Sequence, residues 1–64
     1  MIVWQFPKKR VRIELEESGW WVYIKNEPYR FNSLAECLCY LTGRGVIKYD
    51  QIDYLIQATR KRFE

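Results

Sequence analysis

The sequence predicts an α+β fold, in which an antiparallel β-meander of three to four strands is followed by two helices packed on one face (ββββαα). Three observations indicate this order. Apolar and charged residues alternate strictly from Val11 to Glu16, as in a strand with one buried face. A capping signal at Ser33 precedes an apolar helical stripe, and a second helical repeat runs from about Lys48 to Arg62. We expect the 64 residues to form one small domain, 1–64.

The first hairpin is predicted from two segments that suit neighbouring strands. Residues 20–25 are rich in aromatic and β-branched side chains, and Ser18-Gly19 fits a two-residue loop between them and the alternating segment. The predicted cross-strand pairs are Leu15–Val22, Ile13–Ile24, Glu14–Tyr23 and Glu16–Trp21. Because apolar residues meet apolar residues in this register, we expect one face of the hairpin to be buried.

A further strand, residues 29–31, is expected to return along residues 20–25. Asn26-Glu27 is the predicted turn, because asparagine tolerates the positive φ that hairpin turns require. The turn leaves Pro28 near an outer edge of the sheet, where proline is tolerated. The predicted pairs are Tyr29–Ile24, Arg30–Tyr23 and Phe31–Val22.

The opening segment, Ile2 to Phe6, alternates weakly and is predicted to add a strand before the first hairpin. A four-residue loop, Pro7 to Arg10, would place Ile2, Trp4 and Phe6 on the buried face. A three-residue loop would turn the same side chains to the other face, so the orientation of this strand depends on the loop.

The first helix is predicted from its start signal, its apolar period and its stop signal. Ser33 and Glu36 have the spacing of a capping box, in which each side chain accepts a hydrogen bond from a free backbone N–H. Gly43 is expected to end the helix, because glycine adopts the left-handed conformation without steric cost. The apolar stripe comprises Leu34, Cys37, Leu38 and Leu41.

The second helix is expected after the short connection Gly43-Arg44-Gly45. Acidic residues near its start, Asp50 and Asp53, and the basic run Arg60 to Arg62 near its end complement the helix dipole. Its residues at helical spacing are Ile52, Leu55, Ile56, Thr59 and Phe63.

Composition favours a soluble, cytoplasmic protein that does not enter the membrane. The segment before Lys8 has too few apolar residues for a secretory signal, and no apolar run approaches the ~20 residues that span a bilayer. Cys37 and Cys39 are two positions apart on the predicted helix, so their side chains leave on opposite faces and cannot form a disulfide. Two thiols without histidine fall short of a four-ligand zinc site, so we expect no metal and no cofactor.

The sequence offers little for catalysis. It contains no histidine, the commonest base at neutral pH, and no glycine-rich phosphate loop. Glu14 and Glu16 share one face of a strand, but charged residues are ordinary at the wet positions of a half-exposed strand. We therefore expect a non-enzymatic protein.

The outer face of the predicted sheet is the candidate binding surface. Tryptophan, tyrosine and arginine supply most of the binding energy in protein interfaces, and the same side chains stack on bases in single-strand binders. A structural alternative is that Arg30 rests on the ring of Tyr23 as a stabilising cross-strand pair. The predicted binding residues are Trp21, Tyr23, Arg12, Lys25 and Arg30.

Two classes of partner fit this surface. A net charge of +3, from 11 basic and 8 acidic residues, permits a nucleic acid or an acidic protein. Three strands followed by a helix, with Phe31-Asn32-Ser33 at the junction, resemble the sheet-reading DNA-binding domains of integrase arms and AP2-type factors, which implies a nucleic-acid partner. Glu14 and Glu16, however, would repel phosphate.

The prediction is therefore a small protein-binding module of the regulator, adaptor or inhibitor type. Its expected partner is a protein with an acidic or mixed surface, because such a surface can match both signs of charge. A nucleic-acid-binding protein that uses the same sheet face and the basic clusters Lys8 to Arg10 and Arg60 to Arg62 is the alternative. A homo-oligomer is a further alternative.

Overall fold

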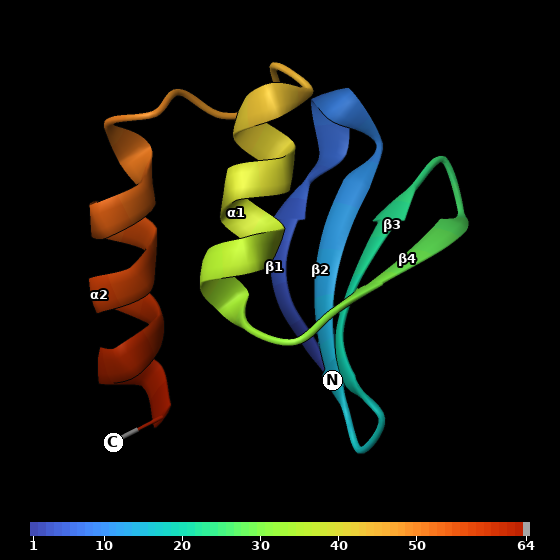
Figure 1. The fold of residues 1–64 in the computed structure, drawn as a ribbon, viewed down its shortest axis with the longest axis horizontal. Coiled ribbons are helices and arrows are strands. Elements are labelled where there is room, and N and C mark those ends of the chain that lie inside the picture. The colour runs from blue at the N-terminus through green and yellow to red at the C-terminus, as the bar shows by residue number, and fades with distance from the viewer. Residues whose placement is uncertain (64) are drawn as a thin grey trace.

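A computed structural model describes residues 1–63. The chain forms a four-stranded antiparallel sheet in the order β1-β2-β3-β4, followed by two helices on one of its faces (Figure 1). The elements are β1 (Ile2–Phe6), the 3-10 turn η1 (Pro7–Lys9), β2 (Val11–Glu16), β3 (Gly19–Ile24), β4 (Glu27–Phe31), α1 (Leu34–Gly43) and α2 (Gln51–Phe63). The predicted ββββαα fold is confirmed.

The loop between β2 and β3 is Glu17-Ser18, and the predicted loop Ser18-Gly19 is wrong. A two-residue hairpin loop of type I′ needs a positive φ at both of its residues. The predicted loop would therefore have required a positive φ at Ser18, which serine seldom adopts. In the structure the positive φ, +129°, is at Gly19, the first residue of β3, and glycine adopts such values freely.

The β2–β3 register consequently differs from the predicted one by two residues. The observed pairs are Val11–Ile24, Arg12–Tyr23, Ile13–Val22, Glu14–Trp21, Leu15–Trp20 and Glu16–Gly19. Because side chains in a strand alternate with a period of two, an even shift keeps every side chain on its predicted face. Ile13 and Val22 accordingly remain fully buried.

The turn between β3 and β4 is Lys25-Asn26, and the predicted turn Asn26-Glu27 is also wrong. Both turn residues take positive φ, 51° and 70°, as a type I′ turn requires. Lys25 therefore lies in the turn and not in the strand where the sequence placed it. The observed pairs are Ile24–Glu27, Tyr23–Pro28, Val22–Tyr29, Trp21–Arg30 and Trp20–Phe31.

The first strand has the predicted loop and, for the most part, the predicted orientation. Residues Pro7–Arg10 connect β1 to β2, and Trp4 and Phe6 pack against the core. The placement of Ile2 is wrong, because the β1–β2 register shifts between Ile2 and Trp4. Such a bulge breaks the alternation of side chains along the strand, so Ile2 does not share the face of Trp4 and Phe6. Val3 is buried, whereas Ile2 is 45% exposed.

Helix α1 begins as predicted. The Ser33 hydroxyl accepts a hydrogen bond from the backbone N–H of Glu36 at 3.2 Å, and the Glu36 carboxylate accepts one from the N–H of Asn32 at 2.9 Å. The prediction that Gly43 ends the helix in the left-handed conformation is wrong. Gly43 is still helical, and the left-handed residue that reverses the chain is Gly45, with φ of 77°.

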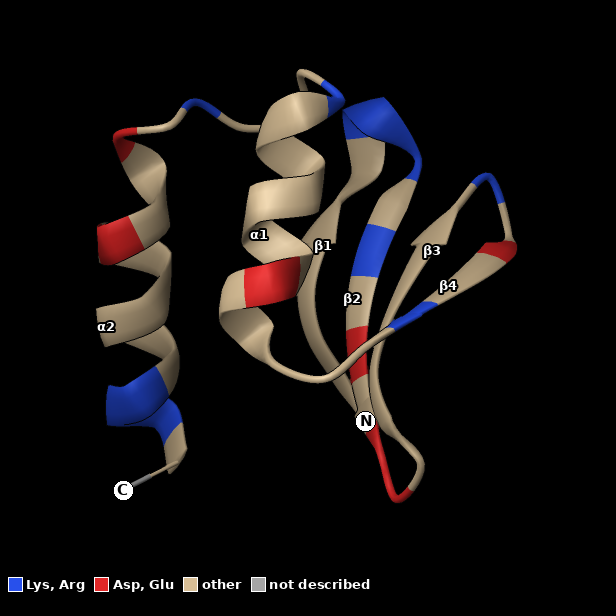
Figure 2. Ribbon diagram, viewed as in Figure 1, with Lys and Arg blue, Asp and Glu red and all other residues tan. Residues whose placement is uncertain are grey.

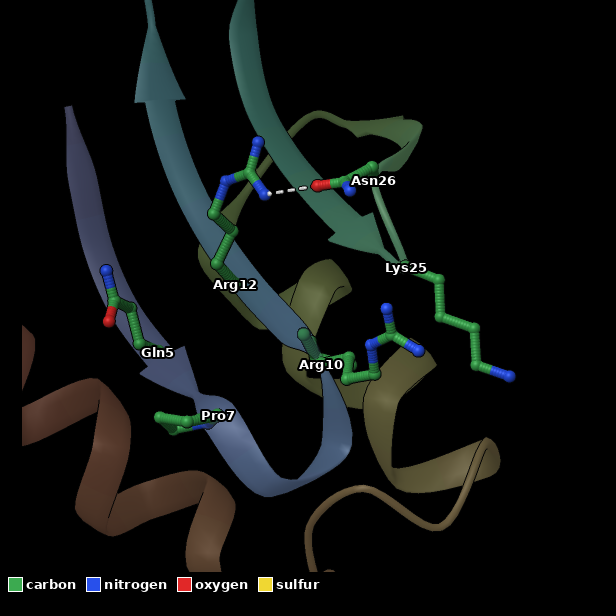
Figure 3. A pocket seen from close by; sticks show the side chains of 7 residues that line it. Gln5, Pro7, Arg10, Arg12, Lys25 and Asn26 are labelled. Atoms are coloured by element: carbon green, nitrogen blue, oxygen red, sulfur yellow. Dashed lines mark hydrogen bonds between the residues drawn. The ribbon is translucent and has the colours of Figure 1, made fainter.

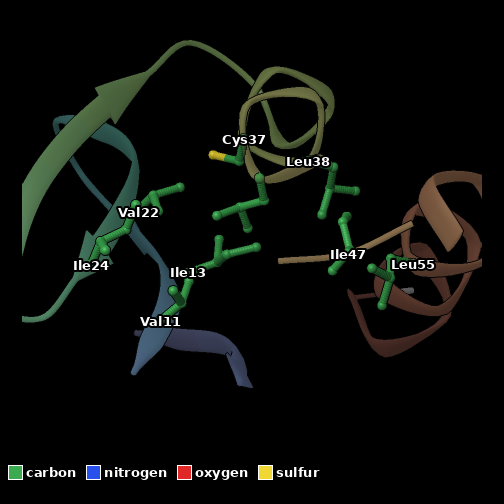
Figure 4. Close-up of a cluster of buried hydrophobic side chains, with 9 residues drawn as sticks. Val11, Ile13, Val22, Ile24, Cys37, Leu38, Ile47 and Leu55 are labelled. Atoms are coloured by element: carbon green, nitrogen blue, oxygen red, sulfur yellow. The ribbon is translucent and has the colours of Figure 1, made fainter. Parts of the chain in front are cut away.

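The core lies between the inner face of the sheet and the two helices, as Figure 4 shows. Three members of the predicted α1 stripe are buried, and Leu34 packs against them. Ile47, from the connection between the helices, was not predicted to take part. The buried cluster comprises Val11, Ile13, Val22, Ile24, Cys37, Leu38, Leu41, Ile47 and Leu55.

Helix α2 lies beside α1 (Figure 1), and its Thr59 is hydrogen-bonded to Trp4 of β1. It begins at Gln51, later than predicted, and the Gln51 side chain accepts a hydrogen bond from the N–H of Lys48 at 2.9 Å. Leu55 and Thr59 of its predicted stripe are buried, but Phe63 is 48% exposed.

Candidate functional site

An aromatic pair stands on the outer face of the sheet, opposite the helices. Trp21 and Tyr23 are partly exposed, with ring centroids 6.4 Å apart and ring planes inclined by 28°. Both residues belong to β3, two positions apart, so their side chains leave on the same face. The Trp21 indole N–H donates a hydrogen bond to the Ser18 hydroxyl at 2.9 Å, which ties the ring to the β2–β3 loop.

Arg12, on the neighbouring strand β2, covers Tyr23. Its guanidinium carbon lies 4.2 Å from the centre of the Tyr23 ring, within cation–π range. The same guanidinium pairs with the carboxylate of Glu14 and donates a hydrogen bond to the Asn26 side-chain oxygen at 3.2 Å. The predicted cross-strand pair of Tyr23 with Arg30 is therefore wrong, since Arg12 takes that position.

Arg30 instead lies at the other end of the aromatic pair. It is opposite Trp21 in the β3–β4 register, and its guanidinium donates hydrogen bonds to the Ser18 carbonyl at 2.6 Å and the Asn32 side-chain oxygen at 3.3 Å. The guanidinium also packs closely over Gly19, because a Cβ built on Gly19 would lie 3.1–3.3 Å from its atoms. Arg30 is thus an exposed cation held in a defined position.

The structure therefore brings together four of the five predicted binding residues. Trp21, Tyr23, Arg12 and Arg30 form one surface, which we call the outer-face cluster. Lys25 is separated from it, because the β3–β4 turn carries this side chain beyond the end of the sheet.

A second feature, which the sequence did not predict, adjoins this cluster. A hollow of about 200 Å³ is lined by residues from β1, η1, β2 and the β3–β4 turn (Figure 3). Arg12 belongs to both the hollow and the outer-face cluster. We call this feature the basic hollow; its lining residues are Gln5, Pro7, Arg10, Val11, Arg12, Lys25 and Asn26.

Charge is distributed unevenly along the sheet. Figure 2 shows basic segments at η1, the β3–β4 turn and the end of α1, an acidic residue directly after that turn where β4 begins at Glu27, and acidic segments at the β2–β3 loop. The other predicted basic cluster, Arg60 to Arg62, has a structural role in part. Arg62 donates a hydrogen bond to the Val3 carbonyl, and its guanidinium carbon lies 5.3 Å from the centre of the Trp4 ring.

The two thiols differ sharply in their surroundings. Cys37 is buried in the core, and burial raises the pKa of its thiol to about 12, whereas Cys39 is exposed. Within residues 1–63, no group of three or more cysteine, aspartate and glutamate side chains lies close enough together to hold a metal ion. In the same residues, neither helix has the length and apolar character needed to cross a membrane.

Comparison with models of known protein families, with curated proteins and with solved structures finds no significant match to this chain. Function has to be inferred from the residues themselves.

Proposed function

We propose that this protein is a small, non-enzymatic protein-binding module that acts through the outer-face cluster. The observation that carries the proposal is the stacked pair Trp21–Tyr23, with Arg12 over the Tyr23 ring, on a sheet face that neither helix occupies. Aromatic and arginine side chains at the centre of an exposed patch are typical of interface hot spots. Their hydrogen bonds to Ser18 and Asn26 fix the side chains in advance, which lowers the entropic cost of binding.

A protein partner fits this cluster better than a nucleic acid does. The charge of Arg12 is already matched by Glu14, so the centre of the cluster is close to neutral. Arg12 also covers one face of the Tyr23 ring, and a base stacking there would have to displace it. A protein surface of mixed charge can instead pair with both Arg12 and Glu14.

The same reasoning gives the type of action and the compartment that we propose. With both cysteines free and no metal-binding group among residues 1–63, binding through the surface is the activity that the chain supports best. We accordingly propose a regulator, adaptor or inhibitor that acts in the cytoplasm, where thiols stay reduced.

The test is affinity capture of partners, with direct binding measurements on each protein captured. Trp21→Ala should weaken binding at least about tenfold, as truncation of a hot-spot residue does. Tyr54→Ala is the matched control, because Tyr54 is an exposed aromatic residue on α2, away from the sheet. Equal effects of the two substitutions would contradict the proposal. Tight binding of DNA or RNA at physiological salt, lost in Trp21→Ala, would favour the nucleic-acid alternative.

A further inference from the structure

The basic hollow combines cations from three separate parts of the fold. Arg10 follows η1, Arg12 is in β2 and Lys25 is in the β3–β4 turn. Figure 3 shows Arg10, Arg12 and Lys25 beside the hollow together with the amide side chains of Gln5 and Asn26, with the end of the Lys25 side chain directed outward, away from Gln5 and Pro7. No carboxylate lines it. Its polar lining is thus rich in hydrogen-bond donors and positive charge.

Two of the three cations lack a counter-ion within the part of the chain that the structure describes. Arg12 pairs with Glu14, but no carboxylate of residues 1–63 lies within 4.0 Å of Arg10 or Lys25. The backbone N–H of Lys25 donates to the Arg10 carbonyl at 2.9 Å, so the two residues are direct neighbours across the hairpin end. No carboxylate offsets either of these positive charges, so an anion bound beside them would be stabilised.

The backbone holds these cations in an uncommon conformation. Arg10, Lys25 and Asn26 are the non-glycine residues with positive φ in residues 1–63, at 57°, 51° and 70°, and all three line the hollow. Arginine and lysine seldom adopt this conformation, which is favoured by glycine and asparagine. The positive φ of Lys25 and Asn26 belongs to the type I′ turn and that of Arg10 to the end of η1, so two turns of the backbone bring these residues to the hollow.

We propose that the basic hollow binds two neighbouring carboxylates of an acidic segment in the protein partner. This inference rests on the proposed function, because Arg12 joins the hollow to the outer-face cluster and one partner segment could contact both. Guanidinium and ammonium groups bind carboxylates through charge-assisted hydrogen bonds. The two uncompensated charges, on Arg10 and Lys25, match two acidic side chains. A hollow of about 200 Å³ admits the ends of such side chains but no folded element.

The probe is a capped hexaglutamate peptide, titrated into the isotope-labelled protein and followed by NMR. The largest shift changes are expected at the amides of Arg10, Lys25 and Asn26. Combining Arg10→Asn with Lys25→Asn should weaken binding about tenfold, because it removes both uncompensated charges. Asparagine suits positive φ, so this variant should remain folded, and a melting curve checks that it does.

The control variant combines Arg44→Gln with Lys48→Gln. It removes the same charge from residues outside the hollow, so it should weaken binding no more than about threefold, through general electrostatics alone. Equal losses in the two double variants, or shift changes centred on Arg60 to Arg62, would overturn the proposal. Inorganic phosphate and single-stranded DNA are titrated in parallel. Occupation of the hollow by either one at physiological salt, more tightly than by hexaglutamate, would replace the carboxylate assignment with a phosphate site.

A further variant separates this inference from the proposed function. Hexaglutamate carries no aromatic group, so Trp21→Ala should weaken its binding much less than it weakens binding of a protein partner. If hexaglutamate binds in the hollow but Trp21→Ala does not weaken binding of any protein partner, only the proposed function is overturned. If the Arg10→Asn and Lys25→Asn double variant binds hexaglutamate as well as the wild type does, while Trp21→Ala still weakens binding of a protein partner, only the acidic-segment inference is overturned.

Discussion

The indole N–H of Trp4 donates a hydrogen bond to the hydroxyl of Thr59 at 2.7 Å and so joins the first strand to the last helix across 55 residues. The Thr59 hydroxyl in turn donates to the Leu55 carbonyl at 2.7 Å. Thr59 is only 4% exposed, and its buried hydroxyl both accepts and donates a hydrogen bond. This contact attaches α2 to the edge of the sheet.

Thr59→Val should lower stability by about 1 kcal/mol or more, because it leaves the Trp4 N–H without its partner in a partly buried site. For a domain of this size that loss corresponds to a melting temperature lower by about 4–8 °C. Thr59→Ser should retain most of the stability. Thr42→Val is the control, because the Thr42 hydroxyl donates only to the Leu38 carbonyl. Equal melting temperatures for Thr59→Val and Thr42→Val would contradict the role given to Trp4.

The fold could be predicted because its signals are periodic and local. Alternation in β2 and the capping signal at Ser33 report directly on elements that the structure contains. Hairpin registers were missed because they depend on which residue takes positive φ, and Lys25 in a type I′ turn contradicts the usual preference for asparagine or glycine. The bulge beside Ile2 has no sequence signal that we can identify.

The alternation of side chains along a strand predicts the face on which each site residue lies, but not its cross-strand neighbours. Trp21, Tyr23, Arg12 and Arg30 were assigned to the correct face, because the register error was an even number of residues. The basic hollow was missed for the opposite reason. It exists only because the true register places Lys25 next to Arg10, which are 15 positions apart in the sequence.

Glycine substitutions should have opposite effects at two positions. Gly19→Ala should destabilise by about 1–3 kcal/mol, because Gly19 has φ of +129° and a Cβ there would press on the Arg30 guanidinium. Gly43→Ala should stabilise by about 0.5–1 kcal/mol, because Gly43 is helical and a Cβ there meets nothing within 4 Å. Urea unfolding measures both. Adding Arg30→Ala to Gly19→Ala separates crowding from backbone strain, since only crowding would be relieved.

The capping box should matter more to stability than an exposed charge does. Ser33→Ala removes the acceptor for the Glu36 N–H and should cost about 1 kcal/mol. Ser33→Asp should restore most of the loss, because aspartate also accepts this hydrogen bond. Lys61→Ala, on the exposed face of α2, is the comparison. The denaturation midpoints of the three variants give the result, and a Ser33→Ala midpoint equal to that of Lys61→Ala would refute the cap.

The two cysteines should react with alkylating reagents at very different rates. Cys39 is exposed and should be modified without unfolding, whereas Cys37 is buried and should react only when the core opens. Mass spectrometry after brief labelling should therefore find one modification, on Cys39. Under denaturing conditions both thiols should react. Rapid labelling of Cys37 in the folded protein would show that the α1 stripe does not pack as the structure describes.

Stability should fall as the pH rises above about 9, in part through Cys37. Burial raises the pKa of this thiol from 9.0 to about 12, so between these values the unfolded chain loses a proton that the folded chain keeps. The unfolded state then binds fewer protons, and the free energy of unfolding decreases with pH across this window. Cys37→Ala removes this contribution while other groups still titrate. The stability difference between wild type and Cys37→Ala, measured by urea unfolding from pH 8 to pH 11, should therefore shift against the wild type as pH rises. A difference that stays constant over this range would mean that Cys37 ionises as readily in the folded protein as in the unfolded chain.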